Sequence, residues 1–372
     1  MAPRSTTPGR GLRVLSVSST AELWGAELAL ATYLRHRPEG FEPRVLCLSS
    51  GPLVDLLRDD GLPATAASLN GRPSLSEAGA FTRRLYADLR RWRPAMVYAT
   101  GNKAAILCLP AARAANVPLV WHRVDLALQR STVWAIASAT SGVIAVSRAS
   151  AAAVPMRRFL GVVPPPVRLS ESFSLPVPRP SATIGSVGQL HPVKGHHDVI
   201  AAAALLNDEL PELRVLIAGG PHPAYPSYPK QLREIALRVG LEDKVELTGH
   251  VGRIEDVYER LTVLVSGTYR DVSGVGPEAL GAAIAEASWA GLPVVATRGG
   301  GTSEVVEHGV TGRLVPPRRP EAMANAIAQY LRDPAAARTA GEAGTELARN
   351  RFRPGPLANT LFSSLGRLGA RR

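Results

Sequence analysis

Short apolar runs bounded by turn residues alternate with longer stretches of helical periodicity along most of this chain. This alternation is typical of repeated strand and helix units around a parallel sheet, because a crossover helix usually joins parallel neighbours. Strand-length apolar runs in the first half cover residues 12–18, 44–48, 96–99, 119–122 and 143–146. Those in the second half cover residues 183–187, 214–218, 245–247, 263–265 and 294–297. The pattern predicts an α/β protein with parallel sheets.

A proline-rich stretch interrupts the alternation at residues 161–181, which read GVVPPPVRLSESFSLPVPRPS. Proline lacks an amide donor and fixes φ, so neither a helix nor a central strand persists there. The sequence predicts two Rossmann-like doubly wound domains, at 1–165 and 182–352, joined by a linker at 166–181 and facing across a cleft. Residues 353–372 are predicted as a helical tail that can pack back on the first domain. Open α/β sheets bind ligands beyond the carboxyl ends of their strands, so function is expected in strand-to-helix loops.

The composition argues against several classes of protein. Of the 372 residues, 45% are hydrophobic and 20% charged, which is ordinary for a globular chain with sizeable cores. The two cysteines, Cys47 and Cys108, lie in apolar runs with no ligand cluster around them, which argues against a disulfide framework and a zinc finger. No apolar run reaches the roughly eighteen residues that span a bilayer, so we expect a cytoplasmic protein.

The formal net charge of +12 favours polyanions of any kind, whether nucleic acid, an anionic lipid surface or a phosphorylated small molecule. A nucleic-acid partner ranks last, because only 5% of residues are aromatic and no recognition module is evident. Residues 83–93 place Leu85, Leu89 and Trp92 on one helical face with arginines beside it. We prefer packing of this helix on a sheet over weak association with an anionic inner membrane face. No oligomeric state is predicted.

The loop after the predicted strand at 183–187 has the residue types of a phosphate-binding turn. It reads GQLHPVKG over 188–195 and runs into a helical stretch. Glycine lets a backbone approach a ligand, a helix N-terminus favours anions, and Lys194 supplies a mobile positive charge. By itself, a tight turn with a solvated lysine is the simpler interpretation. Three nearby histidines lack carboxylate or cysteine ligands at fixed spacing, so no metal site is predicted.

Two glutamates eight residues apart, Glu278 and Glu286, flank the start of a predicted helix near Gly281. In one uninterrupted helix their side chains would lie about 80° and about 12 Å apart, whereas a helix that begins between them can bring both toward one cleft. A carboxylate accepts several hydrogen bonds and can hold paired sugar hydroxyls. Amides at the helix start can meet phosphate or sugar oxygens. The spacing alone is also explained by a pair of solvated helix charges.

The residues that follow complete a wider pattern. AGLPVVAT at 290–297 ends a helix and enters a buried strand, GGGTSEVV follows at 299–306, and GVTG at 309–312. In this order with 188–195 and 278–286, the motifs resemble the retaining, nucleotide-sugar-dependent glycosyltransferases of family 4. The likeness covers nearly the whole second half. It implies a GT-B fold and sugar transfer from a UDP-, GDP- or dTDP-sugar to a hydroxyl acceptor.

The resemblance assigns donor-binding roles residue by residue. It implies that Lys194 contacts the donor diphosphate, that Glu278 binds the transferred sugar, and that Glu286 holds the ribose hydroxyls. The other donor-site positions that it implies, including a base contact at Val251, are Gly188, Gln189, Val251, Leu280, Gly281 and Ala282. One departure concerns charge, because the family usually has arginine where this chain has Gln189. The bidentate cation that would help neutralise the diphosphate is missing there.

In the first half the resemblance covers two short segments. Trp24, Gly25 and Ala26 resemble the family's glycine-rich loop at the cleft mouth, on the acceptor side. His122 resembles a histidine near the donor sugar, and is proposed as catalytic with Glu278 and Lys194. From the residues alone, a hydrogen-bonded core histidine at a strand end is the preferred reading of His122. A second departure is the proline run at 163–167, where relatives tend to carry Asn-Gly.

The sequence therefore predicts a retaining, metal-independent glycosyltransferase without a cofactor. The chain contains no Asp-x-Asp, which agrees with a leaving diphosphate stabilised by protein cations and amides. The acceptor is left open among natural products, lipid-linked intermediates and small metabolites. Alternatives are a non-catalytic nucleotide-sugar-binding protein, a GT-B sugar-nucleotide epimerase and a glycan phosphorylase. The last would need a lysine-bound pyridoxal cofactor, for which no motif is evident.

Overall fold

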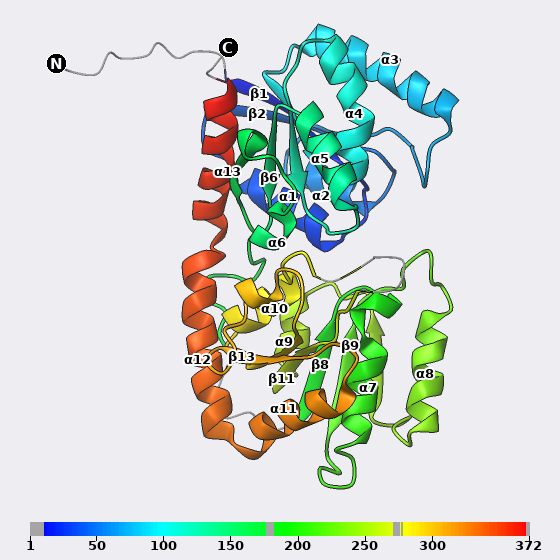
Figure 1. Ribbon diagram of the computed structural model, residues 1–372, viewed down its shortest axis with the longest axis vertical. Helices are drawn as coiled ribbons and strands as arrows, with labels where there is room; N and C mark the ends of the chain where they lie inside the picture. The colour runs from blue at the N-terminus through cyan, green and yellow to red at the C-terminus, as the bar shows by residue number, and fades with distance from the viewer. Residues whose placement is uncertain (1–10, 176–181, 271–275, 277, 370–372) are drawn as a thin grey trace, which may run out of the picture. The chain divides into compact units, whose positions relative to one another are not determined.

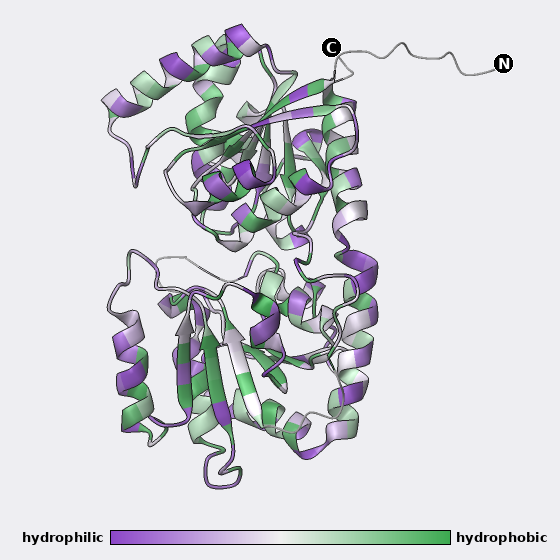
Figure 2. Cartoon of the chain, turned by 180° about the vertical axis from the view of Figure 1, so that it is seen from behind, coloured by the Kyte–Doolittle hydropathy of each residue, from purple (hydrophilic) through white to green (hydrophobic). Residues whose placement is uncertain are grey.

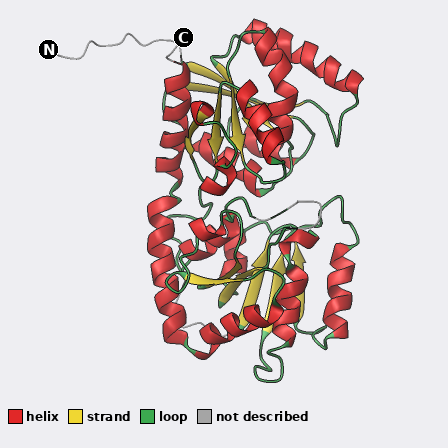
Figure 3. Cartoon of the chain, viewed as in Figure 1, coloured by secondary structure: helices red, strands yellow, loops and turns green. Residues whose placement is uncertain are grey.

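The computed structural model describes residues 11–175, 182–270, 276 and 278–369. The chain forms two compact units (Figure 1). One runs from the N-terminus to Pro166 and resumes at Pro354, and the other comprises Val167–Arg353. In each unit helices flank a parallel sheet (Figure 3). The prediction of two doubly wound α/β domains is confirmed.

The first unit is built on a seven-stranded sheet with the order β3-β2-β1-β4-β5-β6-β7, and all neighbouring strands are parallel. Its strands are β1 (Leu12–Ser18), β2 (Phe41–Cys47), β3 (Ala64–Ala66), β4 (Met96–Thr100), β5 (Leu119–Arg123), β6 (Gly142–Ala145) and β7 (Phe159–Val162). Its helices are α1 (Gly25–Arg35), α2 (Pro52–Asp59), α3 (Leu75–Trp92), α4 (Asn102–Ala114), α5 (Arg130–Ala139), α6 (Arg148–Ala151), the 3-10 turn η1 (Met156–Arg158) and α13 (Pro354–Gly369). β4 and β5 are buried along their whole length, because helices cover both faces.

Two apolar clusters fill the two faces of the first sheet. Residues of α1, α2 and α13 pack on one face, and residues of α3, α4 and α5 on the other. The C-terminal helix α13 contributes Leu361 and Phe362 to the first cluster. The Phe362 ring meets Phe41 of β2 edge-on, with ring centroids 4.7 Å apart. The end of the chain thus completes the core of the unit in which the chain begins.

The second unit is built on a six-stranded parallel sheet with the order β10-β9-β8-β11-β12-β13. Its strands are β8 (Thr183–Val187), β9 (Arg214–Ala218), β10 (Val245–Gly249), β11 (Val263–Ser266), β12 (Val294–Thr297) and β13 (Gly312–Val315). Its helices are η2 (Pro192–Lys194), α7 (His196–Ala204), α8 (Tyr228–Arg238), α9 (Ile254–Tyr258), α10 (Ala282–Trp289), η3 (Thr302–Glu304), α11 (Pro320–Arg332) and α12 (Pro334–Arg351).

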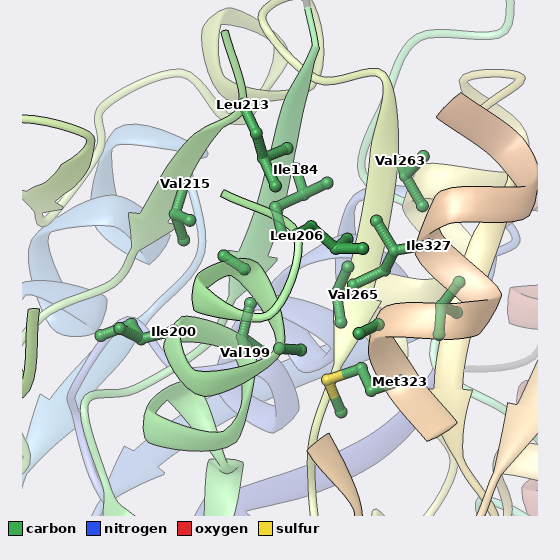
Figure 4. Packing of buried hydrophobic residues seen from close by; sticks show 14 of the residues in the cluster. Ile184, Val199, Ile200, Leu206, Leu213, Val215, Val263, Val265, Met323 and Ile327 are labelled. Carbon is green, nitrogen blue, oxygen red and sulfur yellow. The ribbon is translucent and has the colours of Figure 1, made fainter. Parts of the chain in front are cut away.

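Aliphatic side chains dominate the core of the second unit. On one face of its sheet, Ile184 of β8 and Val263 of β11 pack against Val199 of α7 and Ile327 of α11 (Figure 4). A second cluster lies on the opposite face, between the sheet and helices α9, α10 and α12. Hydrophobic residues follow the strands, whereas α8 carries many hydrophilic residues (Figure 2). The continuous apolar runs of the sequence are therefore strands buried on both faces.

Three short strands at sheet edges, β3, β7 and β13, lie outside the apolar runs from which the strands were predicted. β3 has three residues and two of them are exposed, so its composition carries no burial signal. β13 includes Gly312 and Arg313, and β7 includes Gly161. β2 begins at Phe41 and contains Pro43, which is tolerated because β3 pairs only with the later residues of β2.

Candidate active site

Two residues predicted to bind the donor meet at the carboxyl end of the second sheet. β8 and β11 are neighbours there, and the strand order reverses at this pair. The loop after β8 carries Lys194, and the segment after β11 carries Thr268 and leads to Glu278. Doubly wound sheets bind ligands at such a reversal, so we identify this loop cluster as the candidate active site.

Lys194 and Glu278 form an ion pair in the candidate site. The lysine Nζ lies 2.5 Å from Glu278 Oε1, and the Thr268 hydroxyl donates to the same oxygen at 3.0 Å. A Cβ at Gly188 would lie 3.8 Å from the Lys194 stem, which is ordinary contact. Burial opposes ionisation of Glu278, but the Lys194 ammonium and the bonds from Lys194 and Thr268 outweigh it and lower the pKa of Glu278. The site therefore holds a fixed carboxylate beside a fixed ammonium.

Two glycines bring the loops after β8 and β11 into direct contact. Gly195 has φ +67°, and a Cβ there would overlap the carbonyl of Gly267. A Cβ on Gly267 would lie 2.7 Å from the Gly195 carbonyl oxygen. The Tyr269 amide also donates to the Val193 carbonyl at 2.9 Å. Side chains at either glycine would push the loops apart, so this contact sets the separation of Lys194 from Glu278.

Substituting Gly195 by alanine should destabilise the second unit more than the matched change at Gly240. Both glycines have nearly the same positive φ, +67° and +69°, but a Cβ at Gly240 would meet nothing within 4 Å. Gly240→Ala should therefore cost only the backbone term, about 1–2 kcal/mol. Gly195→Ala adds the overlap with Gly267 and should also weaken donor binding. Urea midpoints of the two variants measure this difference, and equal midpoints would contradict it.

The segment that carries Glu278 is fixed by backbone contacts. The Gly301 amide donates to the Glu278 carbonyl at 2.9 Å, and a Cβ on Gly301 would overlap the Ala279 carbonyl. Gly281 has φ +106° and precedes α10, whose first residue is Ala282. Among the described residues α10 has no side-chain cap and no acid in its first turn. The leading amides of α10 are therefore available to donate hydrogen bonds to phosphate oxygens.

Glu286 lies in different surroundings from Glu278. It is 1% exposed, and its two carboxylate oxygens accept from Arg168 Nε at 2.5 Å and Nη2 at 2.9 Å. The Tyr258 hydroxyl donates to Oε2 at 3.0 Å. Burial opposes the charge on Arg168, but Glu286 more than offsets it and raises the pKa of Arg168. The role of Glu286 in holding ribose hydroxyls stays a prediction, and in this structure Arg168 contacts both of its carboxylate oxygens.

Sequence reasoning did not single out Arg168 or Thr268. Arg168 follows the prolines that mark the predicted linker and lies between Val167 and Leu169. A charged residue between two apolar ones was the signal that could have drawn attention to it. Thr268 lies two residues beyond β11, at a carboxyl end of the kind where function was expected. Neither residue lies at a sequence distance from a glutamate that would predict contact between their side chains. Their contacts arise only when the parallel strands bring distant loops to one edge.

Of the remaining donor-site positions, Gln189 and Val251 lie in the loops after β8 and β10, whereas Leu280 precedes α10 and is buried in an apolar cluster. The Gln189 carbonyl is hydrogen-bonded to His196 Nε2 at 3.0 Å, so the backbone of this loop is fixed. The Gln189 side-chain nitrogen is buried and has no hydrogen-bond partner among the described residues. Val251 is 38% exposed and follows β10 directly after His250. The His250 ring lies against Gly220, where a Cβ would overlap it.

An aromatic cluster that sequence reasoning also missed stands beside the same loops. The His191 ring lies 4.8 Å from His222 and 4.4 Å from Tyr225, both edge-on. Leu190 bridges to Pro221, which holds the loop after β8 against the loop after β9. The three rings come from loops 188–195 and 219–227, which are separated in the sequence and meet only in the folded chain. They place a flat aromatic surface next to the candidate donor loop.

In the first unit, Trp24, Gly25 and Ala26 lie after β1, where its strand order reverses toward β4. Gly25 is exposed and begins α1, and Trp24 and Ala26 are half-buried. Glu27 in the first turn of α1 is 4% exposed, and burial raises the pKa of its carboxyl to about 7. The position of the loop suits ligand contact, and its assignment to the acceptor stays a prediction.

His122 is a core residue in this structure. It is 2% exposed, Nδ1 is hydrogen-bonded to the Tyr98 hydroxyl at 2.5 Å, and Nε2 lies 3.3 Å from the Val163 carbonyl oxygen. Because the carbonyl can only accept, Nε2 carries the proton and Nδ1 accepts from Tyr98. Burial lowers the pKa of His122 to about 4. Both ring nitrogens are thus engaged in the core of the first unit, and a catalytic role of His122 stays a prediction.

The buried His122 should make the first unit sensitive to acid. Its pKa is about 4 in the folded state against 6.5 for the free side chain, so the unfolded chain binds the proton first. Stability is lost as the pH falls from about 6.5 to about 4, and the loss then levels off. His122→Gln keeps a donor and an acceptor but does not titrate. The wild type should therefore lose more unfolding free energy than this variant between about pH 7 and pH 4.5 in urea titrations.

Other candidate sites were tested against the described residues. Nowhere in that part of the chain do three or more His, Cys, Asp or Glu side chains group as metal ligands would. Within the same residues, no helix combines the length and apolar character needed to cross a bilayer. Cys47 and Cys108 are both free and buried.

Comparison with known proteins assigns both halves to sequence families. The family described as Glycosyltransferase Family 4 matches residues 28–170, and the family described as Glycosyl transferases group 1 matches residues 167–347. A D-inositol 3-phosphate glycosyltransferase of Corynebacterium urealyticum is 34% identical over 164 residues, which are 43% of this chain and 37% of that protein. A GDP-mannose-dependent alpha-(1-6)-phosphatidylinositol monomannoside mannosyltransferase of Mycobacterium tuberculosis is 32% identical over 193 residues, 49% of this chain and 47% of that protein. The matched part thus spans less than half of either relative.

Solved structures share the fold over nearly the whole chain. Anabaena HepE, crystallised with UDP and glucose, superposes with a TM-score of 0.82 at 22% identity, covering 95% of this chain and 99% of that one. Sucrose-phosphate synthase of Thermosynechococcus elongatus superposes with a TM-score of 0.76 at 18% identity, covering 97% and 100%.

Proposed function

We propose, from the premise that the chain belongs to the family 4 glycosyltransferases of GT-B fold, that it transfers a sugar from a nucleoside diphosphate sugar to a hydroxyl acceptor. The observation that carries the proposal is the Lys194–Glu278 pair at the reversal between β8 and β11. A cation and a carboxylate fixed beside uncapped helix-start amides match the phosphate and hydroxyl groups of such a donor.

In the proposed reaction the bond between the anomeric carbon and the diphosphate oxygen breaks, and a bond to the acceptor oxygen forms. The acceptor proton passes to the departing diphosphate. Negative charge grows on that diphosphate as the bond breaks. Lys194 and the leading amides of α10 are placed to meet it, which is electrostatic stabilisation of the leaving group. Glu278 accepts hydrogen bonds from hydroxyls of the transferred sugar and orients Lys194 through their direct contact.

We further propose that transfer retains the anomeric configuration and needs no metal ion. Retention follows from attack on the face that the diphosphate leaves, and no enzyme nucleophile is needed in that case. Lys194 and helix-start amides supply positive potential that a metal would otherwise provide. The ribose is assigned to Glu286 together with Arg168, and the base to the backbone near Val251.

For the substrates we propose a UDP-, GDP- or dTDP-sugar and an acceptor hydroxyl on a polar small molecule or lipid-linked intermediate. The names of the curated relatives support this, since one uses GDP-mannose and others act on an inositol phosphate. The net charge of +12 favours a phosphorylated acceptor over a neutral one. The acceptor is assigned to the first unit, beside Trp24, Gly25 and Ala26.

A second candidate is a protein that binds nucleotide sugars without turnover. Two points favour it: Gln189 stands where the family resemblance implies an arginine, and Arg168 already contacts both oxygens of Glu286. In that case the site would bind a nucleotide sugar but lack the positive charge needed to stabilise the departing diphosphate.

Nucleotide release from a panel of UDP-, GDP- and dTDP-sugars separates the two candidates. The transferase should release nucleoside diphosphate slowly by hydrolysis and faster with an acceptor. Glu278→Gln should reduce this rate, whereas Glu246→Gln, in an exposed Arg260 pair of the same unit, should leave it unchanged. Tight binding without release under any acceptor would support the non-catalytic candidate and contradict the transferase.

A further inference from the structure

A cavity of about 710 Å³ lies in the first unit, between the sheet and helix α3. Its wall is formed by strands β1 and β2, the edge strand β3, and the second half of α3. Among the residues that line it are Arg44, Leu46, Thr65, Asp88, Leu89, Arg91 and Trp92. This volume lies within the range of small-molecule sites, about 300–1,000 Å³.

The strand register and the position of α3 explain why the cavity is open. Leu15, Arg44, Leu46 and Thr65 lie on one face of the sheet, because the register pairs Leu15 with Arg44 and Leu46 with Thr65. Leu85 and Leu89 of α3 pack in the cluster that covers β1 and β4. β3 is short and its Thr65 is exposed. The face above β2 and β3 is therefore only partly covered.

The cavity has an apolar floor and a basic rim. Leu46, Leu89 and Trp92 supply the apolar surface. The Arg44 guanidinium stacks over the Trp92 ring at 4.4 Å. Neither Arg44 nor Arg91 forms an ion pair among the described residues, whereas nearby Arg13 pairs with Glu42.

The lining is not uniformly basic. Asp88 is the acidic member of a lining that also includes Arg44 and Arg91. Further exposed arginines on α3 or at its end make the surroundings more basic: Arg83, Arg84, Arg90 and Arg93. A carboxylate in this position can accept hydroxyl protons but repels a second anion. The cavity therefore offers one anionic position, between Arg44 and Arg91.

We infer that this cavity binds a free anionic amphiphile of one chain, with an alkyl group on Leu46, Leu89 and Trp92 and a phosphate monoester between Arg44 and Arg91. A phosphate carries close to two charges at neutral pH, which the two unpaired guanidinium groups match. The apolar surface then buries the chain, which is favourable in proportion to area. The cavity lining includes none of the residues assigned to the proposed transfer reaction, so the inference stands independently of that function.

Dodecyl phosphate is the probe, titrated into the full chain as free monomer by calorimetry. The wild type should bind one equivalent. Arg44→Gln with Arg91→Gln should weaken binding at least about tenfold, the value of one charged hydrogen bond. Thr65→Trp, which fills the cavity from an exposed edge position, should abolish binding. Arg83→Gln with Arg84→Gln, an equal charge change on α3 outside the cavity, should leave the affinity within about twofold.

Two further probes separate the contributions of head and chain. Dodecanol and inorganic phosphate should each bind far more weakly than dodecyl phosphate. Vesicles with anionic lipid test the other source of the same chemistry. The inference would be overturned if dodecyl phosphate did not bind, or if it bound all variants with equal affinity. It would also be overturned if the protein bound only vesicles and Arg84→Gln weakened that binding as much as Arg91→Gln.

Discussion

Replacing Lys194 by methionine is expected to lower donor turnover by about a hundred- to a thousandfold, the usual effect of removing one group that stabilises an oxyanion. Methionine keeps the apolar stem that passes Gly188 but removes the ammonium. Glu278 would then lose its ion pair at 2.5 Å and keep its burial and the Thr268 bond. The pKa of Glu278 should therefore rise, because burial is the largest influence that opposes its charge.

The matched control is Lys230→Met. Lys230 is a largely exposed lysine of α8 in the same unit, where it pairs with Glu234 at 3.7 Å. This variant should retain wild-type turnover, since an exposed pair contributes little. Steady-state kinetics with one donor measures both variants. Wild-type kcat in Lys194→Met would contradict the role of Lys194 in stabilising the departing diphosphate.

Replacing Arg168 by glutamine is expected to destabilise the second unit by about 3–5 kcal/mol, the usual cost of breaking a buried ion pair from one side. Glu286 is 1% exposed and would keep only the Tyr258 bond. Urea unfolding of the variant and the wild type measures this loss.

Arg260→Gln provides the comparison for Arg168→Gln. Arg260 also makes two contacts to one glutamate, Glu246, but both side chains are about half exposed. Its loss should cost less than about 1 kcal/mol, because water solvates the glutamate that remains. If the two arginine variants were equally stable, the account of Glu286 as a buried carboxylate that depends on Arg168 would be wrong.

The architecture was predictable because strands buried on both faces leave unbroken apolar runs. β4 and β12 are such strands, and each lies where the alternation places it. The edge strands β3 and β13 were not predictable in this way. An edge strand is paired on one side and can be three residues long with exposed side chains, so nothing in its composition marks it.

The candidate site was predictable in part. Lys194 and Glu278 lie 84 positions apart, and the parallel sheet brings their loops together at one edge. Glu286 shares the helix motif, but its surroundings depend on Arg168, which lies 118 positions away. His122 ends in a core contact with Tyr98, as its place within an apolar strand allowed. The motifs identified the loops, whereas the burial of these side chains and their ion pairs could be seen only in the folded chain.

A crystal structure of the protein with a nucleoside diphosphate tests the central claim most directly. The account predicts that a phosphate oxygen lies within about 3 Å of Lys194 Nζ and close to the leading amides of α10, with the ribose beside Glu286 and Arg168. A diphosphate bound elsewhere, with the Lys194–Glu278 contact unchanged, would contradict it.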